Sequence, residues 1–142
     1  MEAAWRRAAV YLVCRDGDGR LLLTRFSMPG HANSGQWTMP GGGMEWGETP
    51  IDTAVRELEE ETGLVARIGP LLGVFSRWFE PQETMSGEAG HVIALVYEVP
   101  DARGELRTSF DDGTTDACAW FTLDEVRGLR RADVVDFVLD LL

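Results

Sequence analysis

The segment Gly42–Leu64 reads GGMEWGETPIDTAVRELEEETGL and contains the best-marked helix of this sequence. Thr49 is a suitable N-cap, Pro50 fits the first helical position, and Asp52 can complete a capping-box-like pair. Gly63 suits the C-terminal stop. The sequence therefore predicts a helix between Thr49 and Gly63, entered from a glycine-rich loop.

Three carboxylates gather on one side of this helix. At about 100° per residue, Glu57, Glu60 and Glu61 fall within an arc of roughly 100°, whereas Glu59 points elsewhere. Like charges at this spacing repel one another, and hard divalent cations would relieve the repulsion. A bare glutamate run is more often a solvated acidic face. The core-facing stripe is expected at Ile51, Ala54, Val55 and Leu58.

The spacing of the whole segment decides between these interpretations. Seven identities occur in fixed register, namely Gly42, Glu48, Arg56, Glu57, Glu60, Glu61 and Gly63, with apolar Leu58 and Leu64 among them. In this register the segment resembles the Nudix box of MutT-like hydrolases without a departure. At average residue frequencies, such a match arises by chance at about one in 10⁸ starting positions. The stretches Leu22–Arg25 and Trp37–Gly43 are similar to Nudix sequences with less specificity.

This resemblance implies an α/β/α sandwich with a mixed β-sheet, which we expect as one domain over residues 1–142. It assigns Glu57, Glu60 and Glu61 as ligands of Mg²⁺, with Mn²⁺ as a substitute, and the carbonyl of Gly41 as a further ligand. Glu57 is the first choice for the general base and Glu60 the second. The implied reaction is hydrolysis of a diphosphate linkage in a nucleoside triphosphate, a nucleotide sugar or an ADP-ribose type of compound.

Within the box, the resemblance gives Glu48 and Arg56 a structural role, because a charge-assisted contact between them would tie the loop to the helix. Outside the box, Arg25 is a candidate for holding a phosphate oxygen, with an ordinary surface arginine as the alternative. Asp116 is the preferred candidate for an additional acidic residue, ahead of Asp111 and Asp112, although a turn-forming aspartate is equally consistent with its sequence context.

The remaining elements follow from shorter patterns. Ala8–Cys14 and Leu21–Leu23 are expected to form a hairpin around a tight turn. Trp37–Met39 and Cys118–Phe121 read as short strands, and Asp133–Leu142 as a helix. Longer strands are expected within Val65–Phe79 and His91–Val99, separated by a polar loop. The aromatic residues Trp37, Trp46, Trp78 and Phe79 could stack on a base, although strand aromatics are more often core.

Composition limits the classes of partner. The chain has 142 residues, 44% of them hydrophobic and 26% charged, which is typical of a soluble globular domain. A formal net charge of −11 disfavours nucleic acid as the main partner. No run resembles a signal peptide or a membrane span, so a cytoplasmic protein without membrane contact is expected, as a monomer or homodimer. Cys14 and Cys118 lack metal-ligand spacing and are expected to be buried thiols.

Alternatives remain open at this level. The Nudix box does not choose among nucleotide substrates; Pro81 lies near the position of a proline associated with ADP-ribose hydrolysis, but the spacing is loose. A Nudix-fold module that binds a nucleotide without cleaving it is a second candidate, although such proteins usually lack some of the carboxylates retained here. An isoprenoid diphosphate isomerase would need a catalytic cysteine, and both cysteines lie in core-like stretches.

Overall fold

The described part of the chain contains two β-sheets and three α-helices. The structure, a computed structural model, describes residues 4–111 and 113–142, so Asp112 lies outside the described residues. The elements are β1 (Ala4–Cys14), β2 (Leu21–Phe26), β3 (Trp37–Thr38), β4 (Gly41–Gly43), α1 (Pro50–Thr62), β5 (Leu71–Phe79), a 3₁₀ turn (Pro81–Glu83), β6 (Ala89–Val99), β7 (Thr115–Phe121), α2 (Leu123–Arg127) and α3 (Asp133–Leu141).

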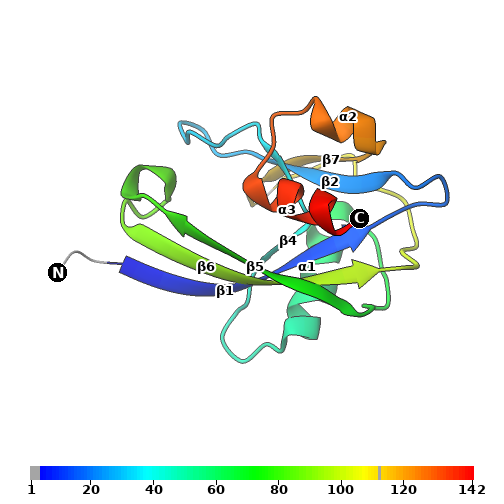
Figure 1. Cartoon of the computed structure of the whole chain (residues 1–142), viewed down its shortest axis with the longest axis horizontal. Coiled ribbons are helices and arrows are strands. Elements are labelled where there is room, and N and C mark those ends of the chain that lie inside the picture. Colours follow the sequence, from blue (N-terminus) through cyan, green and yellow to red (C-terminus); the bar gives the residue numbers. More distant parts are fainter. Residues whose placement is uncertain (1–3, 112) are drawn as a thin grey trace.

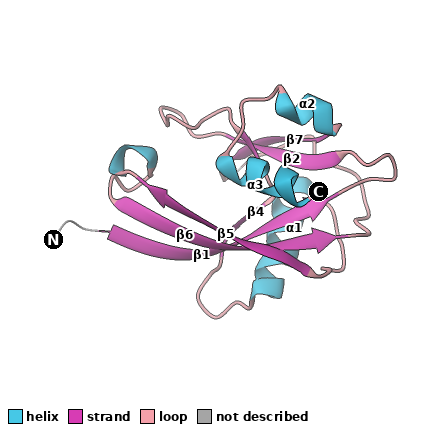
Figure 2. Ribbon diagram, viewed as in Figure 1, coloured by secondary structure: helices cyan, strands magenta, loops and turns pink. Residues whose placement is uncertain are grey.

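The larger sheet is mixed and has the strand order β4-β1-β6-β5. Its central strands β1 and β6 are parallel, whereas β4 and β5 run antiparallel to their neighbours. The smaller sheet is antiparallel, with the order β3-β2-β7. Helix α1 packs on β1 and β4, and α3 packs against β5 (Figures 1 and 2). The predicted mixed sheet and α/β class are confirmed.

Two buried clusters hold these layers together. One lies around Val13, Leu23, Val96 and Val135 and joins both sheets to α3. The other lies around Leu12, Leu22 and Leu58 and joins the sheets to α1. Burial of this apolar area is the main stabilising contribution, at about 25 cal/mol per Å² removed from water. Helix α1, which carries the carboxylates, is therefore anchored on the sheet.

Helix α1 begins and ends as the sequence predicts. The hydroxyl of Thr49 accepts from the N–H of Asp52, whose side chain accepts in return from the N–H of Thr49. Gly63 adopts a left-handed conformation at the C-cap, with φ 79°. The predicted apolar stripe is only half correct, because Ala54 and Leu58 are buried whereas Ile51 and Val55 are exposed. The buried face is completed instead by Thr53 and Thr62.

The predicted hairpin is wrong. Strands β1 and β2 belong to different sheets, and the backbone pairing between these segments is an isolated bridge between Arg15, just after β1, and Leu21. The turn between them is tight, since the N–H of Gly19 donates to the carbonyl of Asp16. Both edges of β1 are already paired, with β4 and β6, so β2 must diverge into the second sheet.

Other boundaries differ in detail. Strand β5 starts at Leu71 rather than Val65, because Gly69 and Pro70 interrupt the segment. Helix α2 was not predicted, and the glycines expected in a loop form β4 and pair with β1. Cys14 is buried as expected, but Cys118 is half-buried. No helix in the described ranges has the length and apolar character needed to cross a membrane.

Candidate metal centre and substrate pocket

The three carboxylates singled out in the sequence face one cavity. Glu57, Glu60 and Glu61 project from α1 into a space of about 220 Å³, which is closed on the other side by the segment before β7 and its first residue. The lining from that side is Arg107, Phe110, Gly113, Thr114 and Thr115. The structure therefore brings the predicted ligands together at the edge of α1.

Glu61 is the most enclosed of the three. Its carboxylate accepts a hydrogen bond from the N–H of Gly41 at 2.6 Å and another from the hydroxyl of Thr115 at 2.9 Å. Burial raises the pKa of Glu61 to about 8 against the opposing effect of these two donors, and the negative charges of Glu57 and Glu60 add to the rise. A cation in this cavity would favour the ionised carboxylate.

Glu57 lies against the glycines of β4. A Cβ at Gly42 would be only 2.7 Å from Oε1 of Glu57, so the lack of a side chain there makes room for the carboxylate. Burial raises the pKa of Glu57, while the guanidinium of Arg56 opposes the shift. Glu60 is more open, with 58% of its side chain exposed. These two carboxylates thus differ in their access to water.

Arg56 ties the box together. Its Nε and one terminal nitrogen donate to the two oxygens of Glu48 at 2.7 and 2.8 Å, and the same nitrogen reaches the carbonyl of Gly43 at 3.3 Å. Its other terminal nitrogen contacts Glu57 at 2.9 Å and Glu60 at 3.2 Å. The contact expected between Glu48 and Arg56 is present, and it links the loop to the helix.

The donor set fits a hard divalent cation. Carboxylate and carbonyl oxygens are the ligands that Mg²⁺ prefers, and three carboxylates share this cavity. Within the described residues, no three acidic, histidine or cysteine side chains already form a closed cage. Glu57 and Glu60 are instead hydrogen-bonded to Arg56, and Glu61 to Gly41 and Thr115. Binding of a cation among the three carboxylates would require these side chains to move.

The two substrate candidates outside the box contact one another. Nε of Arg25 lies 2.7 Å from Asp116 across the pairing of β2 with β7, and both side chains are about 40% exposed. The guanidinium of Arg25 also lies 5.5 Å from the ring of Trp37. Neither residue lines the cavity of the three carboxylates. Asp111 is exposed. The roles suggested for Arg25, Asp116 and Asp111 stay predictions.

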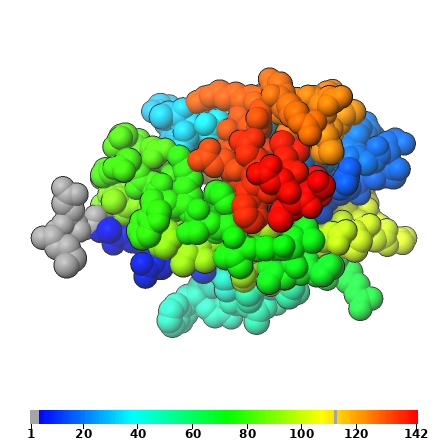
Figure 3. Space-filling view, in the orientation of Figure 1, coloured from blue at the N-terminus to red at the C-terminus, as the bar shows by residue number. Residues whose placement is uncertain are grey.

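A second, larger cavity lies on the other side of the large sheet. It has a volume of about 410 Å³ and opens between the segment around residues 75–85 and the start of α3 (Figure 3). Its walls are mainly apolar, with aromatic rings from Trp5, Tyr11, Phe26, Phe75 and Phe79. Of the aromatic candidates from the sequence, Phe79 lines this cavity, whereas Trp46 and Trp78 are exposed.

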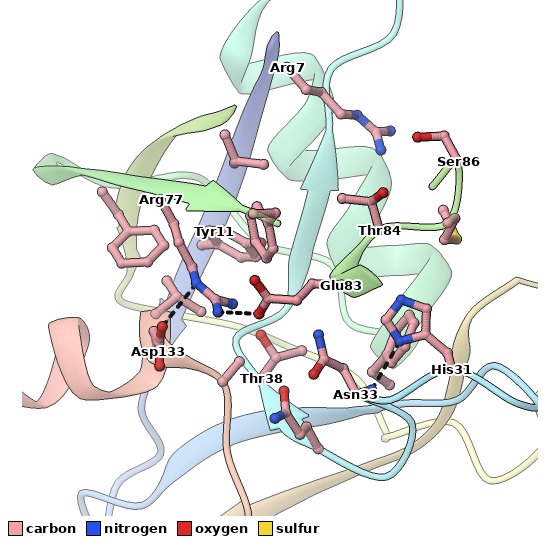
Figure 4. A pocket seen from close by; sticks show the side chains of 18 of the residues that line it. Arg7, Tyr11, His31, Asn33, Thr38, Arg77, Glu83, Thr84, Ser86 and Asp133 are labelled. Carbon is pink, nitrogen blue, oxygen red and sulfur yellow. Dashed lines mark hydrogen bonds and ion pairs between the residues drawn. The ribbon is translucent and has the colours of Figure 1, made fainter. Parts of the chain in front are cut away.

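One charged network crosses this cavity. Arg77 of β5 donates to Glu83 at 2.7 Å and lies 3.0 Å from Asp133 at the start of α3 (Figure 4). The amides of Asn33 and Gln36 add neutral polar groups. This site could not be predicted from the sequence, because its walls come from strands and loops far apart in the chain.

The comparisons with known proteins agree with this geometry. A family model described as NUDIX domain matches residues 5–139. The chain belongs to the Nudix family. A solved Nudix-type structure, the MutT protein from Methanosarcina mazei Go1, superposes with a TM-score of 0.77 and 25% identity over 99% of this chain and 96% of that one.

The chain matches its curated relatives over part of their length. A MutT-like protein from Streptomyces ambofaciens is 37% identical over 109 residues, which are 77% of this chain and 59% of that protein. An ADP-ribose pyrophosphatase from Methanocaldococcus jannaschii is 38% identical over 91 residues, or 64% of this chain and 48% of that protein. The chain thus spans about half the length of the curated relatives it matches.

Proposed function

We propose that this Nudix domain is a metal-dependent hydrolase that cleaves a diphosphate linkage in a nucleoside diphosphate derivative. The observation that carries the proposal is the convergence of Glu57, Glu60 and Glu61 on one cavity, in a chain that retains every carboxylate of the box. In a protein with net charge −11, a cation among these carboxylates would let the site accept a polyanionic substrate.

The cation would be held by Glu57, Glu60 and Glu61, with the carbonyl of Gly41 in addition, and Mg²⁺ with Mn²⁺ as a substitute is the proposed ion. When bound, it would neutralise charge on the phosphate oxygens and favour attack by water. Glu57 accepts the proton of that water in our proposal, because its carboxylate lines the cavity and is more enclosed than that of Glu60. Glu60 is the second choice.

The other residues of the box orient these groups. Arg56 fixes the side chains of Glu57 and Glu60 through its hydrogen bonds, and Glu48 in turn fixes Arg56. Gly41 and Thr115 hold the carboxylate of Glu61. Oriented ligands reduce the reorganisation needed during the reaction, which is how outer residues support a metal site.

The larger cavity supports a nucleoside as the organic part of the substrate. Apolar and aromatic walls with a few polar groups are typical of pockets for planar ligands. Asn33, Gln36, Glu83 and Asp133 offer the amides and carboxylates that recognise the edge of a base. These walls suit a nucleoside triphosphate, a nucleotide sugar or an ADP-ribose type of compound better than a densely phosphorylated small molecule.

A substrate panel tests the proposal. Nucleoside triphosphates, nucleotide sugars, ADP-ribose and dinucleoside polyphosphates are incubated with Mg²⁺ or Mn²⁺, and the products are separated and identified. We expect cleavage of the diphosphate linkage in one class and no turnover after chelation. Binding of a nucleotide without turnover across the panel would instead support a non-catalytic Nudix module.

A further inference from the structure

Arg7 places a positive charge at the wall of the larger cavity. It lies in β1 and is exposed, and its side chain shares the cavity-facing side of the strand with Tyr11, because residues i and i+2 point to the same face. Figure 4 shows Arg7 at one end of the cavity, with its guanidinium directed toward Ser86.

The guanidinium of Arg7 differs from the other arginine side chains that line the two cavities. Arg77 is paired with both Glu83 and Asp133, and Arg107 donates to the carbonyl of Glu60. Arg56, beside the carboxylates, is paired with Glu48. Among residues 4–111 and 113–142, the side chain of Arg7 has no hydrogen bond or ion pair. Its five N–H donors are therefore available to a ligand.

The position of Arg7 links the two cavities. Its guanidinium lies directly on Gly43, where any Cβ would collide with it, while the carboxylate of Glu57 lies on Gly42. Successive residues of a strand face opposite sides, so Arg7 and Glu57 flank β4 from its two faces. Arg7 and Glu57 thus contact adjacent glycines of the same short strand. Strand β4 is an edge strand, which leaves its outer side open to a ligand.

We propose that Arg7 is a substrate-binding residue that holds the phosphate on the nucleoside side of the scissile linkage. The proposal rests on the proposed function, because a substrate with its diphosphate at the carboxylates and its base in the larger cavity must pass the edge of β4. Arginine suits this task, since its planar fork can donate two parallel hydrogen bonds to phosphate oxygens.

The first test is a kinetic comparison of Arg7→Ala and Arg7→Lys with wild type, on the best substrate of the panel. Loss of a charge-assisted hydrogen bond predicts a rise in KM of about 10- to 100-fold for Arg7→Ala. We expect kcat to change much less, and Arg7→Lys to lie between the two because it keeps the charge without the fork. A KM for Arg7→Ala within about twofold of wild type, the range of ordinary surface changes, would overturn the proposal.

The neighbouring Arg6 provides a matched control. It carries the same charge one residue away, but it points to the opposite face and donates to Nδ1 of His91 at 3.1 Å. Arg6→Ala should leave KM within about twofold of wild type. An equal loss in Arg6→Ala and Arg7→Ala would show a general electrostatic effect and contradict the proposal.

A binding measurement separates failure of this proposal from failure of the proposed function. The chain has 13 arginines and no lysine. The arginine Nε–Hε signals can be followed by NMR, and Arg7→Lys identifies that of Arg7. Inorganic pyrophosphate is added together with Mg²⁺. We expect the Arg7 signal to shift and the Arg6 signal to stay. A shift without turnover of any panel compound would reject the hydrolase but keep Arg7 as a phosphate ligand; an unmoved Arg7 signal would reject its role even in an active hydrolase.

Discussion

Replacement of Glu61 with glutamine should stabilise the metal-free protein at alkaline pH and abolish its response to Mg²⁺. Glutamine keeps the shape of the side chain and an acceptor for the N–H of Gly41, but it removes the charge that burial disfavours. Binding of a cation requires this same negative charge on the side chain of residue 61. Stability and metal binding should therefore change in opposite directions.

The magnitude follows from the pKa of Glu61, which is raised from 4.5 to about 8. Above pH 4.5 the unfolded chain loses this proton while the folded protein retains it, so stability falls as pH rises from 4.5 to about 8 and then levels off. At about 1.4 kcal/mol per pKa unit, the full shift corresponds to about 5 kcal/mol. Because Glu61 keeps some contact with solvent, we expect roughly half of this difference at pH 8.

The assay is urea unfolding at pH 8 and near pH 5, with a chelator or with excess Mg²⁺. With chelator at pH 8, Glu61→Gln should be more stable than wild type by about 2 kcal/mol, and the two should converge near pH 5. Mg²⁺ should stabilise wild type at pH 8 through preferential binding to the folded state, and Glu61→Gln much less. Glu59→Gln is the control, because Glu59 is an exposed carboxylate of the same helix.

Two results would refute this reasoning. One is a Glu61→Gln variant that is less stable than wild type with chelator at pH 8, since that would mean the buried charge is favourable without a cation. The other is an equal gain of stability from Mg²⁺ in wild type and Glu61→Gln. A gain that also disappears in Glu59→Gln would point to nonspecific ion binding.

Three further predictions concern the fold around the site. Gly41→Ala should lower the free energy of unfolding by about 2 kcal/mol or more in urea titrations, because φ is +147° and a Cβ would collide with the carbonyl of Val10; an unchanged midpoint would contradict this. The pKa of Glu48 is lowered to about 2 mainly by its hydrogen bond from Arg56, so the stability of this contact is present above about pH 4.5 and lost as pH falls toward 2. Arg56→Lys should therefore weaken the dependence of stability on pH in that window, as measured by circular dichroism during acid unfolding. An acid unfolding curve identical to that of wild type would contradict this prediction. Burial raises the pKa of Cys14 to about 12, so its thiol should resist a disulfide reagent in the native protein while half-buried Cys118 reacts first, as peptide mass mapping would show; modification of Cys14 first would argue against the packing of β1.

The local features of the site could be predicted from the sequence because they depend on residues close in the chain. The capping box at Thr49, the stop at Gly63 and the common side of Glu57, Glu60 and Glu61 all follow from helix geometry. The apolar stripe was only half predicted, because the sheet contacts a face centred on other residues and leaves Ile51 and Val55 exposed.

The substrate side could not be predicted in the same way. The larger cavity joins β1, β5, the loop before β3 and the start of α3, and no local pattern indicates which of these segments meet. The hairpin failed for a related reason, since the pairing of β1 with β6 is parallel and spans most of the chain. Arg25 was chosen from its strand position, but only the structure shows that it pairs with Asp116 while Arg7 faces the cavity.

The most direct test of the central claim compares Glu60→Gln with Glu59→Gln in the turnover of the preferred substrate, at increasing Mg²⁺ concentration. The two glutamates are neighbours on α1 with the same charge. Glu60 lines the smaller cavity, together with Glu57 and Glu61, whereas Glu59 does not. We predict that Glu60→Gln lowers kcat by about 100-fold or more while remaining folded, and that Glu59→Gln behaves like wild type. Equal activity of the two variants, or turnover that persists after chelation of the metal, would contradict a metal centre at these carboxylates.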